Sequence, residues 1–464
     1  MIRKAGKGPF RRSASVSLAL CLMLPVILLL FNGILMAGRK SRGEVDLVRG
    51  TALTAESALA FFDRGLYSDF GLFGLDIASM EKAGSTLVGP GPDVVYRMTP
   101  DKPLSEPGVL RDGIARHMTL RSVTGIIADA LDKLEGIRFL ENKIDLSSLA
   151  DLLPDLPRDP YRAVDPQLDY EEEPDWLSEY NQLMDDEVRA VYQEGLALLA
   201  PLSFPREDGS FENLDYDPFG GQGLDQLGRV LDRLLFVAPE GFLDRVILSE
   251  YSLSYFKNDV PFQLDGGERR EDRTPDGRPI SAFPDSRDRE AEEIATGFTG
   301  SKAALTINMF IGSIRFVMHL IHSLTDQTKM TEFRTSAAGL SVLISVVSMG
   351  EVNISPELLT WILIISATLI QASRDTIQLK KGHVQDLWPG NLPVNLPMRY
   401  RDYLRLLIVL QPPDLIASRI SGVIGRVYPG PYYSGLLCQG EWEGVKVTHA
   451  ASYLGRSGGK EGSE

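Results

Sequence analysis

A 21-residue apolar segment, Val16–Met36, limits what this chain can fold into more than any other feature of the sequence. A helix of that length extends about 30 Å, which is the thickness of the hydrocarbon core of a bilayer. No charged residue occurs between Ser13 and Gly38, and basic residues flank the segment on both sides. The sequence therefore predicts a transmembrane anchor over residues 13–38, embedded in membrane lipid, after a cytoplasmic basic tail at residues 1–12.

A cleaved signal peptide is the alternative to an anchor. The apolar region of a signal peptide is usually about 7–15 residues long and ends in a small-x-small motif. The best candidate motif here, Leu35-Met36-Ala37, has a large residue where a small one is needed. No cysteine follows it, which excludes a lipoprotein, so an uncleaved anchor is expected.

Charge is distributed unevenly along the 464 residues. Residues 1–50 hold nine Lys or Arg and two acids, a net +7, so the total of −15 leaves −22 for the other 414 residues. An acidic body of this kind repels a phosphate backbone, and we expect no nucleic-acid partner. Because the basic residues on the two sides of the anchor nearly balance, the predicted orientation rests on the short tail and the acidic body. It places the N-terminus in the cytoplasm and the body outside it.

Beyond the anchor, the spacing of apolar residues predicts an α+β fold that is mainly α. Residues 39–153 are expected to form a stalk helix and an α+β region, and residues 154–287 a variable middle region with polar linkers. An apolar helical bundle at 288–427, a C-terminal β-hairpin region at 428–454 and a disordered tail at 455–464 complete the prediction. The stalk is expected to continue the anchor helix to about Gly65, with a break near Gly38–Gly43.

Individual elements follow from the same patterns. Helices are predicted at Gly113–Glu135, Asp175–Leu199, Arg289–Leu324, Thr331–Met349, Pro356–Lys381 and Tyr400–Val427, the last broken at Pro412-Pro413. A short strand is predicted at Val94–Met98, an extended segment at Tyr67–Asp76, and polar linkers at Pro154–Pro174 and Asp265–Asp288.

Two of the predicted helices are apolar enough to raise the question of further membrane spans. Leu358–Ala372 would extend about 22 Å as a helix, which is short for a bilayer. Ala303–Leu324 is long enough, but it contains Arg315, and a charge at a helix centre costs about 2.5–3.5 kcal/mol on insertion. A buried core is the favoured interpretation, and additional spans are the alternative.

No catalytic, cofactor-binding or metal-binding residue is predicted. His319 and His322 share a helix face, but no further ligand lies one turn away in that helix. The acidic run Asp169–Asp175 lacks the spacing of a calcium loop, and Asp69-Phe-Gly71 lacks the other elements of a kinase. Phe219–Gly223 is not a phosphate loop, and Cys21 and Cys438 are expected neither to pair nor to bind zinc.

The anchor "SASVSLALCLMLPVILLLFNGILMAGRKSRG" resembles those of TadE/TadG-type proteins of the Flp, or tight-adherence, pilus system. The "LTAESALAFFDRGLYSDFGLFGLD" that follows resembles an uncharacterised, mostly Gram-positive bacterial family of single-anchor proteins. "DREAEEIATG", "DTIQLKKGHVQDLWPG" and "YRDYLRLLIVL" are similar to later motifs of that family. The resemblance implies an accessory or minor pseudopilin-like component of a Tad/Flp-type pilus or secretion system, which contacts other membrane or pilus proteins.

The chain departs from pilins in one respect. No acidic residue precedes Glu44, whereas a pilin-type leader needs a Glu at the fifth mature position, so processing by prepilin peptidase and polymerisation as a major pilin are not expected. The alternatives to an accessory role are a polytopic membrane transport subunit and an exported enzyme of unknown type.

Overall fold

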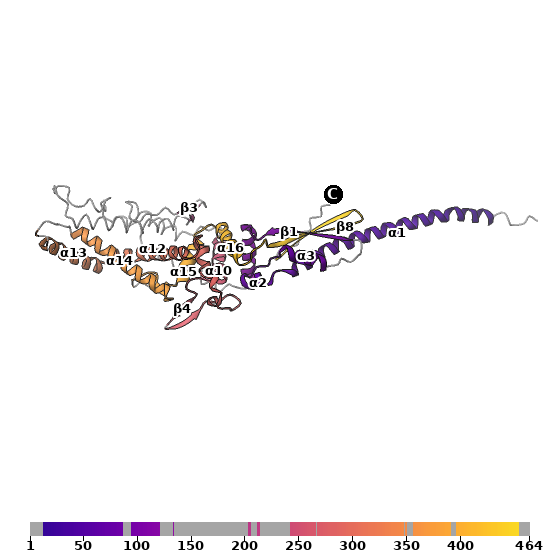
Figure 1. The fold of residues 1–464 in the computed structure, drawn as a ribbon. Helices are drawn as coiled ribbons and strands as arrows, with labels where there is room; N and C mark the ends of the chain where they lie inside the picture. The colour runs from indigo at the N-terminus through magenta and orange to yellow at the C-terminus, as the bar shows by residue number, and fades with distance from the viewer. Residues whose placement is uncertain are drawn as a thin grey trace, which may run out of the picture. The chain divides into compact units, whose positions relative to one another are not determined.

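A computed structural model of the chain describes residues 13–86, 94–120, 133, 203–205, 211–213, 242–265, 267–347, 349, 356–390 and 396–453 (Figure 1). The described chain is mainly helical with a few short strands, as an α+β, mainly α fold requires. It divides into two compact units. Unit 1 comprises residues 1–67, 73–104 and 431–464, and unit 2 comprises residues 68–72 and 105–430.

Unit 1 is built from segments near both ends of the sequence. It contains α1 (Ser13–Ala58), a 3-10 turn (Leu59–Phe61), α3 (Ile77–Thr86) and a three-stranded antiparallel sheet. The sheet has the order β1-β8-β9, with β1 at Val95–Pro103, β8 at Tyr433–Trp442 and β9 at Val445–Ser452. The predicted strand and C-terminal hairpin are therefore confirmed, and β1 continues five residues past Met98.

Helix α1 runs for 46 residues without interruption, so the predicted break near Gly38–Gly43 is wrong. A glycine inside a helix costs only about 1 kcal/mol, which the surrounding helix can absorb. The helix ends at Ala58, earlier than the predicted Gly65. Its C-terminal half buries a stripe at helical spacing, namely Leu47, Thr51, Ala55 and Ala58, and packs against β8 and β9.

Two glycines allow this helix and the hairpin to approach closely. A Cβ atom added to Gly440 of β8 would lie 2.3 Å from the Thr51 hydroxyl oxygen. A Cβ atom added to Gly43 of α1 would lie 2.1 Å from the ring of Trp442. The tight hairpin turn that positions β8 has positive φ at both Glu443 and Gly444, as two-residue turns of this kind require.

The segment Tyr67–Asp76, predicted as extended, begins as helix instead. The carboxylate of Asp63 accepts a hydrogen bond from the Leu66 backbone N–H at 3.0 Å and starts α2 (Arg64–Phe70). Gly71, with φ of +67°, follows the helix. Extended pairing is limited to a single bridge between Leu75 and Tyr433.

Unit 2 contains α10 (Phe242–Tyr255) and α15 (Tyr400–Val409) in its core. Every residue from Arg245 to Tyr255, and every residue of α15, is buried. The other described helices are α4 (Pro107–Leu120), α11 (Glu290–Thr296), α12 (Ser301–Thr325), α13 (Gln327–Val347), α14 (Pro356–Lys380) and α16 (Pro413–Val427). The short strands are β2 (Ser203–Pro205), β3 (Phe211–Asn213), β4 (Phe262–Asp265), β5 (Glu268–Glu271), β6 (Gln385–Asp386) and β7 (Pro397–Met398).

The predicted helices of the apolar bundle are largely confirmed. α13 begins four residues before the predicted Thr331, α14 matches its prediction to within one residue, and the break at Pro412-Pro413 separates α15 from α16. The predicted helix Arg289–Leu324 is in fact two helices. Gly297 and Gly300, both with positive φ, separate α11 from α12.

The helix predicted to begin at Gly113 begins at Pro107, a residue suited to a helix start. The predicted linker Asp265–Asp288 is not a simple surface linker. It contributes β5 and two 3-10 turns, and it buries Ile280, Phe283 and Arg287. The predictions for residues 1–12, 121–132, 134–153, 154–174, 175–199 and 455–464 fall outside the described residues.

Candidate functional site

Three of the motifs that carry the family resemblance lie in unit 2. Asp288–Gly297 contains α11, Asp375–Gly390 runs from α14 past β6, and Tyr400–Leu410 contains α15. Several of their charged side chains are buried, and Glu290, Glu293, Arg401 and Arg405 each pair with a charged residue outside their own motif. Buried charges of this kind need compensating charges or hydrogen bonds, so these contacts define the candidate site.

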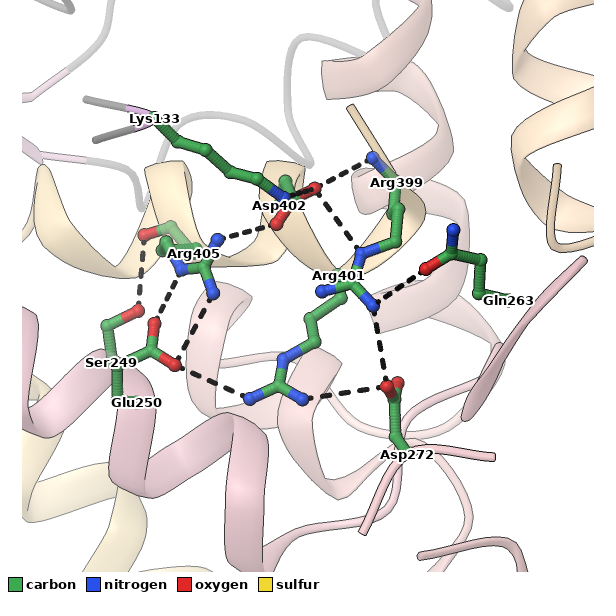
Figure 2. Close-up of polar contacts among 9 residues, drawn as sticks. All are labelled: Lys133, Ser249, Glu250, Gln263, Asp272, Arg399, Arg401, Asp402 and Arg405. Atoms are coloured by element: carbon green, nitrogen blue, oxygen red, sulfur yellow. Dashed lines mark hydrogen bonds and ion pairs between the residues drawn. The ribbon is translucent and has the colours of Figure 1, made fainter. Parts of the chain in front are cut away.

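The largest cluster is centred on Arg405 of α15 (Figure 2). Its guanidinium donates to Glu250 of α10 at 2.5 Å and to Asp402 at 2.5 Å. All three side chains are at most 2% exposed. We call the whole cluster the buried ionic network; its members are Lys133, Glu250, Asp272, Arg399, Arg401, Asp402 and Arg405.

The outer members of the buried ionic network link α10 and α15 to the β4–β5 hairpin. Arg401 lies 3.4 Å from Glu250 and 3.7 Å from Asp272, the residue that follows β5. Arg399 lies 3.6 Å from Asp272 and also donates to Gln263 of β4 at 3.2 Å. Each carboxylate of the network therefore contacts at least two cations.

The sequence of α15 explains the positions of these groups. Asp402 accepts a hydrogen bond from the Arg399 backbone N–H at 2.8 Å and so caps the start of the helix. Arg405 lies one turn further along on the same face. Burial alone would raise the pKa of Asp402, but the charges of Arg405, Lys133 and Arg399 outweigh it and hold that pKa below its usual value.

The acidic helix α11 forms a second cluster. Glu290 accepts from Arg287 at 2.9 and 3.0 Å, and Glu293 pairs with Arg426 of α16. Glu292 has a different environment, since no cation bonds to it among the described residues. Its Oε1 accepts the Asp259 backbone N–H at 2.8 Å and the Tyr400 hydroxyl at 3.0 Å.

Glu292 is fully buried, and its Oε2 has no hydrogen-bond partner in the described part of the chain. Burial raises the pKa of this carboxyl to about 7, against the opposing effect of its hydrogen bonds. The folded protein therefore takes up a proton at Glu292 that an unfolded chain would release near pH 4.5.

Replacing Glu292 with Gln is expected to change how stability depends on pH. The folded-state pKa lies above the unfolded one, so the wild-type protein loses stability as pH rises from about 4.5 to about 7. One group contributes at most about 1.4 kcal/mol per pH unit in that window. In chemical unfolding of the full chain, the free energy of unfolding of E292Q should therefore rise relative to that of the wild type as pH increases from about 4.5 to about 7. Glu268→Gln, on the exposed β5, should show no such pH-dependent difference. A constant difference between E292Q and wild type would contradict this assignment.

A third cluster lies inside the most apolar part of unit 2. Arg315 of α12 pairs with Asp375 of α14 and donates to the carbonyl oxygens of Asp386 and Leu387. His319 Nε2 lies 2.7 Å from the same carboxylate. The charge of Arg315 is thus neutralised within the protein, as a core helix requires.

The structure separates the two histidines that share a face of α12. His319 contacts Asp375, whereas the ring of His322 packs edge-on against Trp388 at 5.6 Å. Among the described residues, no group of three or more His, Cys, Asp or Glu side chains could hold a metal ion. Asp69 of the Asp-Phe-Gly sequence accepts hydrogen bonds from Arg278 and Tyr428. The runs at 169–175 and 219–223 lie outside the described residues.

The apolar half of α1 is a second candidate for a functional surface. Large apolar side chains from Leu22 to Met36 are 47–71% exposed along the helix. Two described helices are long and apolar enough to cross a membrane, α1 and α12. In α1 the 18-residue apolar stretch has no buried residue, whereas 67% of the 18-residue apolar stretch of α12 is buried. α1 is therefore a candidate membrane anchor, and α12 is packed as a core helix is.

The sequence identified the motifs but not their partners. Glu250 and Asp272 lie far from α15 in the chain, in segments that showed no motif. A signal was nevertheless present, because Arg401, Asp402 and Arg405 interrupt an otherwise apolar helix, and charges there require buried partners. The two free cysteines lie in different environments, since Cys21 is exposed and Cys438 is buried.

Comparisons with family models, with curated proteins and with solved structures found no match for this chain.

Proposed function

We propose that this protein is an accessory or minor pseudopilin-like component of a Tad/Flp-type pilus or secretion system, which acts through protein–protein contacts. The observation that carries the proposal is the division of α1 into two halves. One half presents exposed apolar side chains, and the other is packed against the sheet of unit 1. A subunit that joins an assembly through its membrane helix needs an exposed apolar helix fixed rigidly to its body.

The sequence resemblance supports the same role, and the missing acid before Glu44 favours an accessory subunit over a major pilin. In this proposal Val16–Met36 crosses the cell membrane once, with the N-terminus in the cytoplasm and the acidic body outside. The buried ionic network then has a structural role, since its carboxylates and cations neutralise one another inside unit 2.

Site-specific photo-crosslinking of the full chain in native membranes tests the proposal. A crosslinking amino acid at Leu29, which is 71% exposed, or at Ile34, which is 65% exposed, should capture membrane components of the Tad/Flp apparatus. The matched control is Leu53, 64% exposed on the same helix beyond the apolar segment. Adducts with lipid alone at Leu29 and Ile34 would reject the proposed role.

A polytopic membrane transport subunit is the second candidate, because α12 is long and apolar enough to span a bilayer. Single cysteines at Ser301 and Thr325, the first and last residues of α12, distinguish the two models. Both should react with a membrane-impermeant maleimide from the same side of the membrane. Labelling from opposite sides would replace the single-anchor model with the polytopic one.

A further inference from the structure

The C-terminal half of α13 carries an exposed apolar surface that the proposed function does not use. We call it the α13 patch, and it consists of Leu340, Val342, Leu343, Val346 and Val347 of α13 together with Met349, two residues beyond the end of the helix. Val346 and Val347 are 71% and 74% exposed, and Met349 is 93% exposed. In a soluble body such a surface usually marks a contact with another molecule.

The packing of α13 explains why the patch is uncovered. α13 lies beside α14 (Figure 1). Among the side chains of α13, Ala337 and Ser341 are buried and form a narrow stripe. Val342 and Val346 lie four residues apart, as do Leu343 and Val347. These pairs project from the remaining surface of the helix. Isolated exposed apolar residues need no explanation, but a continuous stripe on one helix does.

We propose that the α13 patch binds the same patch on a second copy of this chain. The six side chains leave on the order of 700 Å² uncovered, if a fully exposed Val, Leu or Met presents roughly 160–200 Å². That is close to the ~800 Å² that each partner contributes to a standard interface. No charged residue occurs from Thr335 to Gly350, so two copies can meet there without burying like charges.

A membrane fits the α13 patch less well. Leu340–Val347 extends only about 12 Å as a helix, less than half of the hydrocarbon thickness. The chain then passes Glu351 and Glu357 before the apolar part of α14. A hairpin inserted tip-first would carry these two acids to the greatest depth, where charged groups are most costly. This inference does not depend on the proposed function.

Cysteine crosslinking of the full chain in its native membrane tests the dimer. In a Cys21→Ser background, Val342→Cys and Val346→Cys should give a disulfide-linked dimer under mild oxidation. Leu243→Cys is the control, because Leu243 is 56% exposed on α10 and should report only random collisions. Adding Leu343→Lys to the Val346→Cys chain should abolish the dimer and leave the cysteine reactive toward a water-soluble maleimide.

Crosslinking at Val342 and Val346 no greater than at Leu243 would overturn the proposal. If maleimide then labels both positions, the α13 patch is open to water. If maleimide does not label them, lipid, another part of this chain or a different protein covers the patch. Either result rejects the second copy as its occupant.

Discussion

Replacing Arg405 with Met is expected to destabilise unit 2 by about 3–5 kcal/mol. Removing one member of a buried ion pair leaves the other charge without compensation in a low-dielectric interior. Here the change affects two carboxylates, Glu250 and Asp402, which are at most 1% exposed. Their remaining contacts with Arg401, Arg399 and Lys133 place the loss near the lower end of that range. Denaturant unfolding of the full chain in mild detergent, followed by circular dichroism, measures it.

Two further variants show whether the charge itself is responsible. Lys446 forms an exposed pair with Glu441 at 3.7 Å, and Lys446→Met should cost no more than about 1 kcal/mol. The double variant Glu250→Gln with Arg405→Met should recover part of the loss, since one orphaned charge is gone. A loss below about 1 kcal/mol for R405M would mean that the buried ionic network is not a stabilising unit.

The second large effect concerns α1, the candidate membrane anchor. Val26 is the central residue of Val16–Met36, and Val26→Arg should reduce membrane insertion of α1 by about 3–4 kcal/mol. The reason is that an arginine at the centre of a membrane helix costs roughly 2.5–3.5 kcal/mol, while valine is slightly favourable there. At about 1.4 kcal/mol per tenfold change, the equilibrium constant for insertion should fall by about two to three orders of magnitude.

Carbonate extraction of cell membranes measures this effect. Val26→Arg should move the protein into the extractable fraction, whereas Leu53→Arg should leave it in the membrane. Leu53 is 64% exposed on the same helix but lies outside the apolar segment. Retention of V26R in the membrane at the wild-type level would show that α1 alone does not hold the protein there.

The helices were predictable because their apolar residues recur at helical spacing over long segments. This holds for α13 and α14, whose bounds the sequence placed to within four residues. For α1 the sequence predicted the helix, but the predicted break near Gly38–Gly43 is absent and the helix ends at Ala58 rather than Gly65. The division between α11 and α12 was not predictable from spacing, because the apolar pattern continues across it. The division depends on the positive φ values of Gly297 and Gly300, and the spacing of apolar residues contains no information about backbone angles.

The partners of the charged motifs required the structure. Glu250, Asp272 and Asp375 are ordinary acids in the sequence, and tertiary packing brings each to its arginine. The segment Asp265–Asp288 is so polar that its composition indicates a surface linker. In the structure Arg287 nevertheless lies buried, 4.4 Å from the ring of Phe283 and 4.6 Å from that of Phe70, and it pairs with Glu290.

The assembly of unit 1 from α1 and the hairpin β8–β9 has a consequence for the order of synthesis. The ribosome releases the Leu47, Thr51 and Ala55 stripe of α1 nearly 400 residues before the strands that cover it. Until Tyr433–Ser452 has emerged, that face of the helix has no sheet to pack against, and contacts so distant in sequence form slowly. A nascent or truncated chain therefore leaves this stripe of α1 uncovered, and unit 1 can complete its packing only after the last strand has been made.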